Sequence, residues 1–375
     1  MPLFDSPAAR FNLLEYCWSL VLCASEGEEQ ALFWKALQRG EASFLATLRQ
    51  GALFPYVYAL LAEQAPTVSL PPELLAELRN AYLCSVRQAV VQESEAARVL
   101  GSLAGAGLDI VLLKGADLRL RVYPDPAVRP MTDLDLLVPP EQAGRARSLL
   151  TGLGYTPLEP EPRPGFLERF GHALGLQPPP EFSLYVDLHW EIREGLGYYR
   201  LPYEVIKPRL QEVLFHGLPL KVLAPEHLLI HLCLHTYWEF SQWRQFLDLA
   251  LAIRRLPLNR KQFAAAVKAC RCEVPVCRVL DLGRSLLPEP SFSPTALGLS
   301  DTRPGLAERF VADGTLGPLI PYLAVLSHHP LQDWLPFLAA KLWPQRSYLA
   351  AKLGSASRWR YLLKFLRKFQ KKDFL

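Results

Sequence analysis

The segment between residues 110 and 138 constrains the fold more than any other part of this chain. It contains two apolar runs, one ending at Lys114-Gly115 and one carrying Asp133 and Asp135 at alternate positions. Successive side chains of an extended strand point to opposite faces, so the two carboxylates share one face while the leucines face the other way. Neighbouring carboxylates repel each other, and a cation with oxygen ligands, typically Mg²⁺, relieves that repulsion. The second run therefore predicts a strand that binds a divalent metal.

A turn at Gly115 is predicted between a strand over residues 109–113 and a short helix over residues 116–122. Backbone N–H groups at such a turn can approach a phosphate closely. Lys114 and Arg129 could neutralise nucleotide phosphates, the arginine by bidentate contact, while the alternative for both is a structural salt bridge to the acidic cluster. A phosphate cradle beside a carboxylate pair predicts metal-assisted chemistry on a nucleotide.

These motifs resemble the signature of the DNA polymerase β-type nucleotidyltransferase superfamily. A longer pattern is similar to the branch called uncharacterised nucleotidyltransferases, and it consists of LLKG at 112–115, Tyr123, Asp125-Pro126, Arg129, DLDLLV at 133–138 and Gly154-Tyr155. The resemblance extends from about residue 20 to about residue 253. One departure is Gly115-Ala116, where the superfamily usually has Gly-Ser or Gly-Gly, and the alanine removes a hydroxyl contact to phosphate.

The resemblance implies a third carboxylate from a later strand, and Asp187 in the segment VDLHW matches it. It implies three groups of site residues: Asp133, Asp135 and Asp187 as catalytic ligands of Mg²⁺ or Mn²⁺; Lys114, Gly115, Ala116 and Arg129 around the nucleotide; and His189, His235 and Arg244 toward the acceptor. For His235 and Arg244 a structural role is the alternative. Asp248 also matches a helical position of the family. For His189, orienting Asp187 and simple core packing are alternatives to a substrate contact.

The implied activity is Mg²⁺-dependent transfer of a nucleoside monophosphate, with AMP from ATP favoured, to an unidentified small molecule, peptide or protein. The alternative from another class is a non-catalytic nucleotide-binding or regulatory protein on a degenerate scaffold. Ala116 favours this alternative weakly, whereas the presence of all three carboxylates argues against it. A third hypothesis is a zinc site on the helix that carries His227, His231 and His235, although a packed helix face is the more ordinary explanation of that spacing.

The expected fold class is α+β, with a small mixed-sheet nucleotidyltransferase core flanked by helical regions. We expect an N-terminal helical region at 1–107, an α/β core at 108–200 and a C-terminal helical region at 201–375. In the first region Leu13, Cys17, Leu20 and Val21 recur at helical spacing. Within the core, the stretch 159–180 is rich in Pro and Gly and is predicted to be a mobile loop.

Charge and cysteine usage limit the other functional classes. The formal net charge of +4 is too mild to indicate a nucleic-acid binder. No apolar run approaches the length of a bilayer crossing, and the N-terminal stretch has no basic leader. The 7 cysteines are scattered, which fits a reducing compartment better than a disulfide framework, and Cys270, Cys272 and Cys277 lack the pairing of a metal site. We therefore expect a cytoplasmic protein.

The C-terminal tail, residues 355–375, places basic residues among aromatic and aliphatic ones at helical spacing. Such a pattern predicts a basic amphipathic helix. It allows three interpretations: a solvated helix, a helix that lies on an anionic membrane or an acidic partner, and a nucleic-acid contact. Because the tail lies outside the resemblance, we expect it to affect targeting or acceptor choice rather than nucleotide chemistry.

Overall fold

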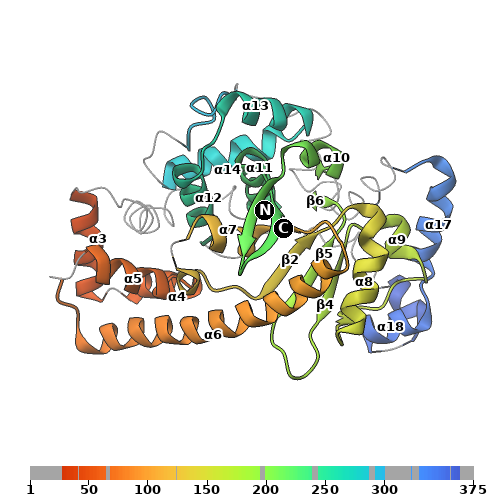
Figure 1. Ribbon diagram of the computed structural model, residues 1–375, viewed down its shortest axis with the longest axis horizontal. Helices are drawn as coiled ribbons and strands as arrows, with labels where there is room; N and C mark the ends of the chain where they lie inside the picture. The colour runs from red at the N-terminus through yellow and green to blue at the C-terminus, as the bar shows by residue number, and fades with distance from the viewer. Residues whose placement is uncertain are drawn as a thin grey trace.

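The described residues that precede the sheet are mainly helical, as the sequence predicts. The computed structural model describes residues 28–40, 42–64, 68–123, 125–194, 199–238, 244–286, 292–299, 322, 329–354 and 356–363. The helices before the sheet are α3 (Glu28–Arg39), α4 (Ala42–Gln50), α5 (Phe54–Gln64) and α6 (Pro72–Gly105). The 34-residue α6 begins with a proline, whose missing N–H costs nothing in the first turn, and runs beneath the rest of the molecule (Figure 1). The helical residues expected near Leu13 lie outside the described residues.

A mixed sheet of seven strands forms the centre of the structure. Its strands are β1 (Val111–Leu112), β2 (Asp133–Leu137), β3 (Thr156–Pro157), β4 (Ala173–Gln177), β5 (Tyr185–His189), β8 (Gln211–Phe215) and β9 (Leu218–Val222). Their order is β3-β4-β5-β2-β1-β9-β8, with β2 parallel to β5 and β1 parallel to β9, and the other neighbours antiparallel. Helices flank this sheet on both sides in sequence, so the α+β class is confirmed.

Short helices connect the strands of the core. They are α7 (Lys114–Arg121), α8 (Ala143–Gly152), α9 (Phe166–Phe170) and α10 (Tyr203–Ile206), with 3₁₀ turns at Pro126–Val128, Pro140–Gln142 and Lys207–Arg209. A separate two-stranded sheet pairs β6 (Ile192–Glu194) with β7 (Tyr199–Leu201). Leu134 and Leu136 are buried in a core shared with α6 and α8, which leaves the opposite face of β2 to its carboxylates.

Two expectations about secondary structure are wrong. The stretch 159–180, predicted to be a mobile loop, contains α9 and β4, because Leu174 and Leu176 are buried and β4 pairs with both β3 and β5. The segment after residue 200, predicted to return to helices, first forms the β8–β9 hairpin, which extends the sheet beyond β1. The boundary of the core at residue 200 remains a prediction, although the sheet itself continues to residue 222.

Helices from the second half of the chain cover one end of the sheet. Four of them pack together: α11 (Pro225–Trp238), α12 (Arg244–Arg255), α13 (Arg260–Ala269) and α14 (Glu273–Leu286). Helices α17 (Leu331–Leu342) and α18 (Arg346–Leu353) lie apart from this group, beside α8 and α9 (Figure 1). No helix among the described residues has the length and apolar character needed to cross a bilayer.

Candidate functional site

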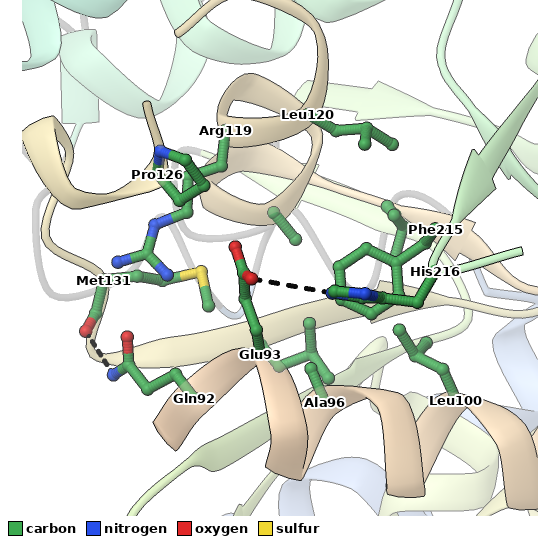
Figure 2. Close-up of a pocket in the computed structure, with 13 residues that line it drawn as sticks. Gln92, Glu93, Ala96, Leu100, Arg119, Leu120, Pro126, Met131, Phe215 and His216 are labelled. Carbon is green, nitrogen blue, oxygen red and sulfur yellow. Dashed lines mark hydrogen bonds and ion pairs between the residues drawn. The ribbon is translucent and has the colours of Figure 1, made fainter. Parts of the chain in front are cut away.

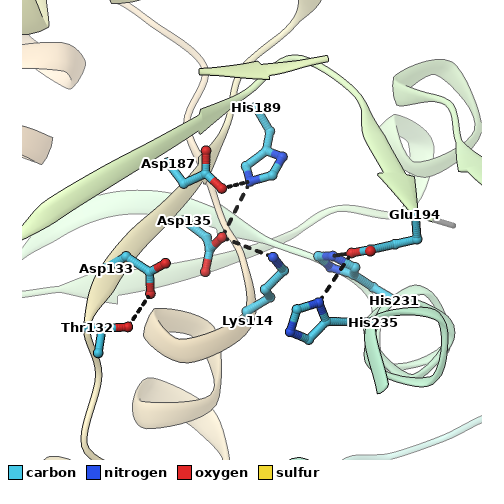
Figure 3. Close-up of polar contacts among 9 residues, drawn as sticks. All are labelled: Lys114, Thr132, Asp133, Asp135, Asp187, His189, Glu194, His231 and His235. Atoms are coloured by element: carbon cyan, nitrogen blue, oxygen red, sulfur yellow. Dashed lines mark hydrogen bonds and ion pairs between the residues drawn. The ribbon is translucent and has the colours of Figure 1, made fainter. Parts of the chain in front are cut away.

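The parallel pairing of β2 with β5 gathers the predicted carboxylates on one face of the sheet. Asp135 lies directly opposite Asp187 in the register, and Asp133 is two residues earlier on the same face of β2. Ligand atoms of Asp135, Asp187 and His189 lie within 4.8 Å of one another (Figure 3). The carboxylates therefore meet through a pairing between segments about fifty residues apart in sequence.

Two cations surround Asp135. Lys114 Nζ lies 3.2 Å from Asp135 Oδ1, and His189 Nε2 lies 3.4 Å from the same oxygen and 3.1 Å from Asp187 Oδ2. Burial would raise the pKa of Asp135, but Lys114 and then His189 outweigh it and lower that pKa well below its usual range. Burial likewise opposes ionisation of Asp187, and His189 outweighs it and lowers the pKa of that carboxyl.

The pKa values of Lys114 and His189 are raised, whereas those of Asp135 and Asp187 are lowered. For Lys114, burial lowers the pKa, and the carboxylates of Asp135, Glu194 and Asp187 more than compensate, so the amine stays charged. For His189, burial is again outweighed, and Asp135 and Asp187 raise the pKa to about 9. Without a metal, Lys114 and His189 therefore supply the positive charge that the acidic face requires.

Asp133 occupies a different environment from its neighbour. Its Oδ1 accepts a hydrogen bond from the Thr132 hydroxyl at 3.1 Å. Burial, followed by the charge of Asp135, raises the pKa of Asp133, because proximity to Lys114 is not enough to compensate. The two carboxylates of the DxD motif are thus electrostatically distinct, and Asp133 is the one whose charge is poorly compensated within the protein.

The Lys114-Gly115 turn has a strained backbone and close packing. Lys114 opens α7 with a φ of 40°, in the left-handed region that residues other than glycine seldom adopt. A Cβ on Gly115 would lie 2.8 Å from Arg129 Nη1 and 3.1 Å from the Met131 side chain. Glycine is favoured here because a Cβ would force the Arg129 or Met131 side chain to move, and this close approach packs the start of α7 against the arginine.

Arg129 is held in a buried salt bridge. Its Nε and Nη2 donate to Asp248 Oδ1 and Oδ2 at 2.9 and 2.7 Å, and the Tyr123 hydroxyl donates to Asp248 Oδ1 at 2.7 Å. The sequence allowed a structural salt bridge as the alternative role of Arg129, and the structure contains one. The acidic partner is Asp248 on α12 rather than the DxD cluster. Nη1 remains beside Gly115, so Arg129 both braces the turn and borders the site.

A cleft of about 290 Å³ lies between this face of the sheet and the helices α11 and α12. Most of the predicted site residues line it: Lys114, Gly115, Arg129, Asp133, Asp135, Asp187, His235 and Arg244. Burial, followed by the charge of Arg129, lowers the pKa of Arg244. Thr132, Thr236 and Gln245 also border the cleft and were not anticipated from the sequence. Asp248 borders it as well, so the cleft combines four carboxylates with the basic side chains of Lys114, Arg129 and Arg244.

Ala116 lies elsewhere. Its side chain borders a second cavity, of about 210 Å³, on the other side of α7, between α6 and the β8–β9 hairpin. Figure 2 shows the surroundings of this cavity, where the Gln92 side chain donates to the Met131 carbonyl and His216 Nε2 lies 3.5 Å from a Glu93 carboxylate oxygen. The Ala116 methyl group therefore does not enter the acidic cleft, and a hydroxyl on that side chain would not point there without a change of structure.

Glu194 is a buried carboxylate that sequence reasoning missed. Its Oε1 lies 3.4 Å from His231 Nε2 and 3.6 Å from His235 Nδ1 (Figure 3). Burial would raise the pKa of Glu194, and the two histidines outweigh it and lower that pKa. Burial lowers the pKa of His231 to about 4, so its imidazole is neutral. The sequence signal that could have indicated a buried acidic partner is the pair of histidines, His231 and His235, on an otherwise apolar helix.

Within the part of the chain that the structure describes, the histidine helix does not form the hypothesised zinc site. Among the described residues, the one group of three metal-ligating side chains close enough to share an ion is Asp135, Asp187 and His189. His227 is buried on α11, and burial followed by the charge of Arg209 lowers its pKa. The spacing of these histidines is thus explained by packing and by the contact with Glu194.

A larger groove of about 780 Å³ adjoins the cleft. Asp133 and Asp187 border both spaces, so the two meet at these carboxylates. Its walls come from β5, the segment 158–167 and the C-terminal helices, and include the aromatic side chains of Phe166, Tyr185 and Tyr348 together with Lys341. The acidic face is therefore accessible from two sides.

Comparison with known proteins identifies a family for most of this region. The family model described as uncharacterised nucleotidyltransferase matches residues 38–288. No curated protein matches the sequence at a significant level. Solved structures with partial similarity include the antibiotic-resistance factor ANT(2'')-Ia in solution, at 14% identity over 50% of this chain and 94% of that one, with a TM-score of 0.37.

Two further structures are similar to a comparable extent. The crystal structure of ANT(2'')-Ia with adenylyl-2''-tobramycin has 14% identity over 49% of this chain and 98% of that one, with a TM-score of 0.36. An antigenic nucleotidyltransferase-like protein from Paracoccidioides brasiliensis has 15% identity over 53% of this chain and 93% of that one, with a TM-score of 0.32. These scores are too low to transfer a residue role or a substrate.

Proposed function

The chain belongs to the uncharacterised nucleotidyltransferase family, and from this premise we propose that it transfers a nucleoside monophosphate, AMP from ATP in the first instance, to a hydroxyl group of an acceptor. The observation that carries the proposal is the convergence of Asp133, Asp135 and Asp187 on one cleft that also contains Lys114 and Arg244. Carboxylates suit divalent cations, and the basic side chains suit the phosphates of a nucleotide.

The three carboxylates fit a Mg²⁺ or Mn²⁺ site. Hard divalent cations prefer carboxylate oxygens, and Asp133, whose charge is least compensated within the protein, provides one beside Asp135 and Asp187. A cation bound by these residues would supply Lewis-acid stabilisation of charge on the phosphates. Such binding would compete with the contacts that Lys114 and His189 make to Asp135.

The triphosphate is assigned to the side of the cleft formed by the start of α7. Lys114 and the N–H groups at Gly115 would contact its oxygens, because they border the same space. The guanidinium of Arg244, expected from the sequence to face the acceptor, also borders this space and is reassigned to the triphosphate. Arg129 would act mainly by bracing Gly115, since Asp248 already holds two of its nitrogens. Ala116 would contribute at most its backbone, as its side chain faces the other cavity.

The acceptor is assigned to the larger groove. Its volume of about 780 Å³ can admit a drug-sized molecule or a short stretch of peptide. In the proposed step the acceptor oxygen attacks the α-phosphorus, the bond to the bridging oxygen breaks and pyrophosphate leaves. Asp187 borders both spaces and would take the proton of the acceptor hydroxyl. His189 would orient Asp187 through their 3.1 Å contact.

The test separates nucleotide binding from transfer. Binding of ATP with Mg²⁺ is measured by calorimetry, and transfer is measured with α-labelled ATP and panels of hydroxyl-bearing small molecules, peptides and proteins. We expect Asp135→Asn and Asp187→Asn to abolish transfer. Asp109→Asn, at a half-exposed aspartate that pairs with Lys221 away from the cleft, should have no effect. Binding without transfer to any acceptor would favour the regulatory alternative, and absence of binding would contradict both.

A further inference from the structure

Exposed apolar side chains are concentrated in the C-terminal helices. Of 15 large hydrophobic residues exposed among the described residues, seven lie between residues 331 and 363. These seven are Leu331, Trp334, Leu335, Leu342, Trp343, Trp359 and Leu363. A soluble monomer seldom exposes so many apolar residues close together, and such a concentration is typical of a surface that binds a partner or a membrane.

Helix α17 presents two apolar faces. Phe337 and Ala340 are buried against the aromatic side chains of α9. Leu331, Leu335 and Leu342 recur four and seven residues apart on the opposite side and are 76%, 79% and 39% exposed. The inner face is satisfied by packing within the protein, whereas the outer face remains in contact with water.

The position of these helices is fixed by polar contacts with the core. Arg163 Nη2 donates to the Trp343 carbonyl at 3.0 Å, and the Gln345 N–H donates to the Pro162 carbonyl at 2.8 Å. Asp333 forms an ion pair with Arg169, and Lys352 Nζ lies 2.6 Å from a carboxylate oxygen of Glu159. These contacts hold the inner face on the core, so the leucine face cannot be hidden by rotating the helix in place.

Positive charge is concentrated in the same part of the sequence. Residues 331–375 contain ten Lys or Arg and two Asp or Glu, a net charge of +8, whereas the whole chain carries +4. Trp359 is 74% exposed between Arg358 and Arg360, and the Arg358 guanidinium lies over the Trp343 ring at 4.8 Å. Exposed leucines, tryptophans at their border and a strong excess of cations are the features of a helix that lies in a membrane interface.

We propose that the C-terminal region docks on an anionic lipid bilayer, with the outer face of α17 in the interface and the basic residues beside Trp359 against the lipid headgroups. An acidic protein surface would complement the positive charge, but it would not explain the exposed leucines along one face of α17 as well as a lipid bilayer does. Because Lys341 of α17 and Tyr348 of α18 also border the larger groove, docking would bring that groove close to the bilayer.

Sedimentation of the full chain with lipid vesicles tests this proposal. We expect binding to vesicles of phosphatidylcholine and phosphatidylglycerol in equal parts, little binding to phosphatidylcholine alone, and weakening by salt. The double variant Leu331→Ser/Leu335→Ser keeps every charge and should lower vesicle affinity about tenfold or more. Leu214→Ser is the matched control, since Leu214 is 67% exposed on β8, at the opposite edge of the sheet.

Three outcomes would overturn the proposal. The first is absence of binding to anionic vesicles at low salt. The second is equal binding by the wild type and the double variant, which would indicate a general polyanion contact made by the charges alone. The third is concentration-dependent self-association that the double variant abolishes without a change in vesicle binding, which would identify a second copy as the occupant. Thermal unfolding verifies that the variants are folded, and Trp359→Ser provides an independent variant outside α17.

Discussion

Removing Asp248 should destabilise the protein strongly and weaken nucleotide binding, although Asp248 is not among the residues assigned to contact the triphosphate. The carboxylate receives two hydrogen bonds from Arg129 and one from Tyr123, and the side chains of the salt bridge are only 9% and 4% exposed. Burial would lower the pKa of Arg129, but Asp248 outweighs it and raises that pKa, so the guanidinium is charged. Asp248→Ala would leave that charge buried without a partner.

The magnitude follows from the burial of the pair. Loss of one partner of a buried salt bridge costs about 3–5 kcal/mol, because the remaining charge is neither solvated nor compensated. Tyr123→Phe removes a single hydrogen bond to a charged group and should cost less, about 1.5–3 kcal/mol. Combining Arg129→Met with Asp248→Ala removes the stranded charge, so the double variant should be more stable than the sum of the single changes predicts, by about 0.5–3 kcal/mol.

Urea unfolding followed by tryptophan fluorescence measures these free energies. The control is Glu77→Ala, which breaks a bidentate pair of similar geometry with Arg49 at 2.6 and 2.7 Å. Those side chains are 46% and 43% exposed, so water solvates the remaining charge and little change is expected. Equal destabilisation by Asp248→Ala and Glu77→Ala would refute the argument from burial. Unchanged ATP affinity in Asp248→Ala would refute the bracing of Gly115 through Arg129.

Three further predictions concern the cleft. Asp133→Asn and Asp135→Asn should both abolish transfer. In thermal unfolding, Asp133→Asn should be neutral or stabilising, whereas Asp135→Asn should cost about 3 kcal/mol of stability because Lys114 loses its carboxylate partner. Equal melting temperatures of the two variants would contradict the different environments of the two residues. Gly115→Ala should cost about 1–3 kcal/mol and reduce ATP affinity, since its Cβ would meet Arg129 Nη1 at 2.8 Å, and calorimetry with urea unfolding checks both effects. ATP with Mg²⁺ together should raise the melting temperature more than either alone, and chelation of the metal should remove the extra shift.

Local patterns in the sequence anticipated much of the candidate site. Alternation placed Asp133 and Asp135 on one face of a strand, and the resemblance implied Asp187 in VDLHW as a third carboxylate from a later strand. The pairing of β2 with β5 then brought these carboxylates together in one site. The Gly115 turn was also anticipated, but its steric reason was not, because that reason depends on Arg129 and Met131 packing against it.

Composition misled where long-range pairing outweighed it. The Pro- and Gly-rich stretch 159–180 contains β4 because neighbouring strands supply hydrogen bonds and buried leucines supply packing. The β8–β9 hairpin was not predicted, because its two strands join the sheet only through the pairing of β9 with β1. Propensity describes a segment by itself, whereas the stability of a strand depends on the partner beside it.

The sequence by itself determined the kinds of chemical group in this protein and the face of each strand on which they lie, because the alternation of a strand is a local property. Only the tertiary structure decided which charges compensate one another. It paired Arg129 with Asp248, 119 residues away, assigned Glu194 to the histidines of α11 and turned Ala116 away from the cleft. Such choices depend on burial and distance between remote segments, since the free energy of a charge is set by the water it loses and the partner it gains.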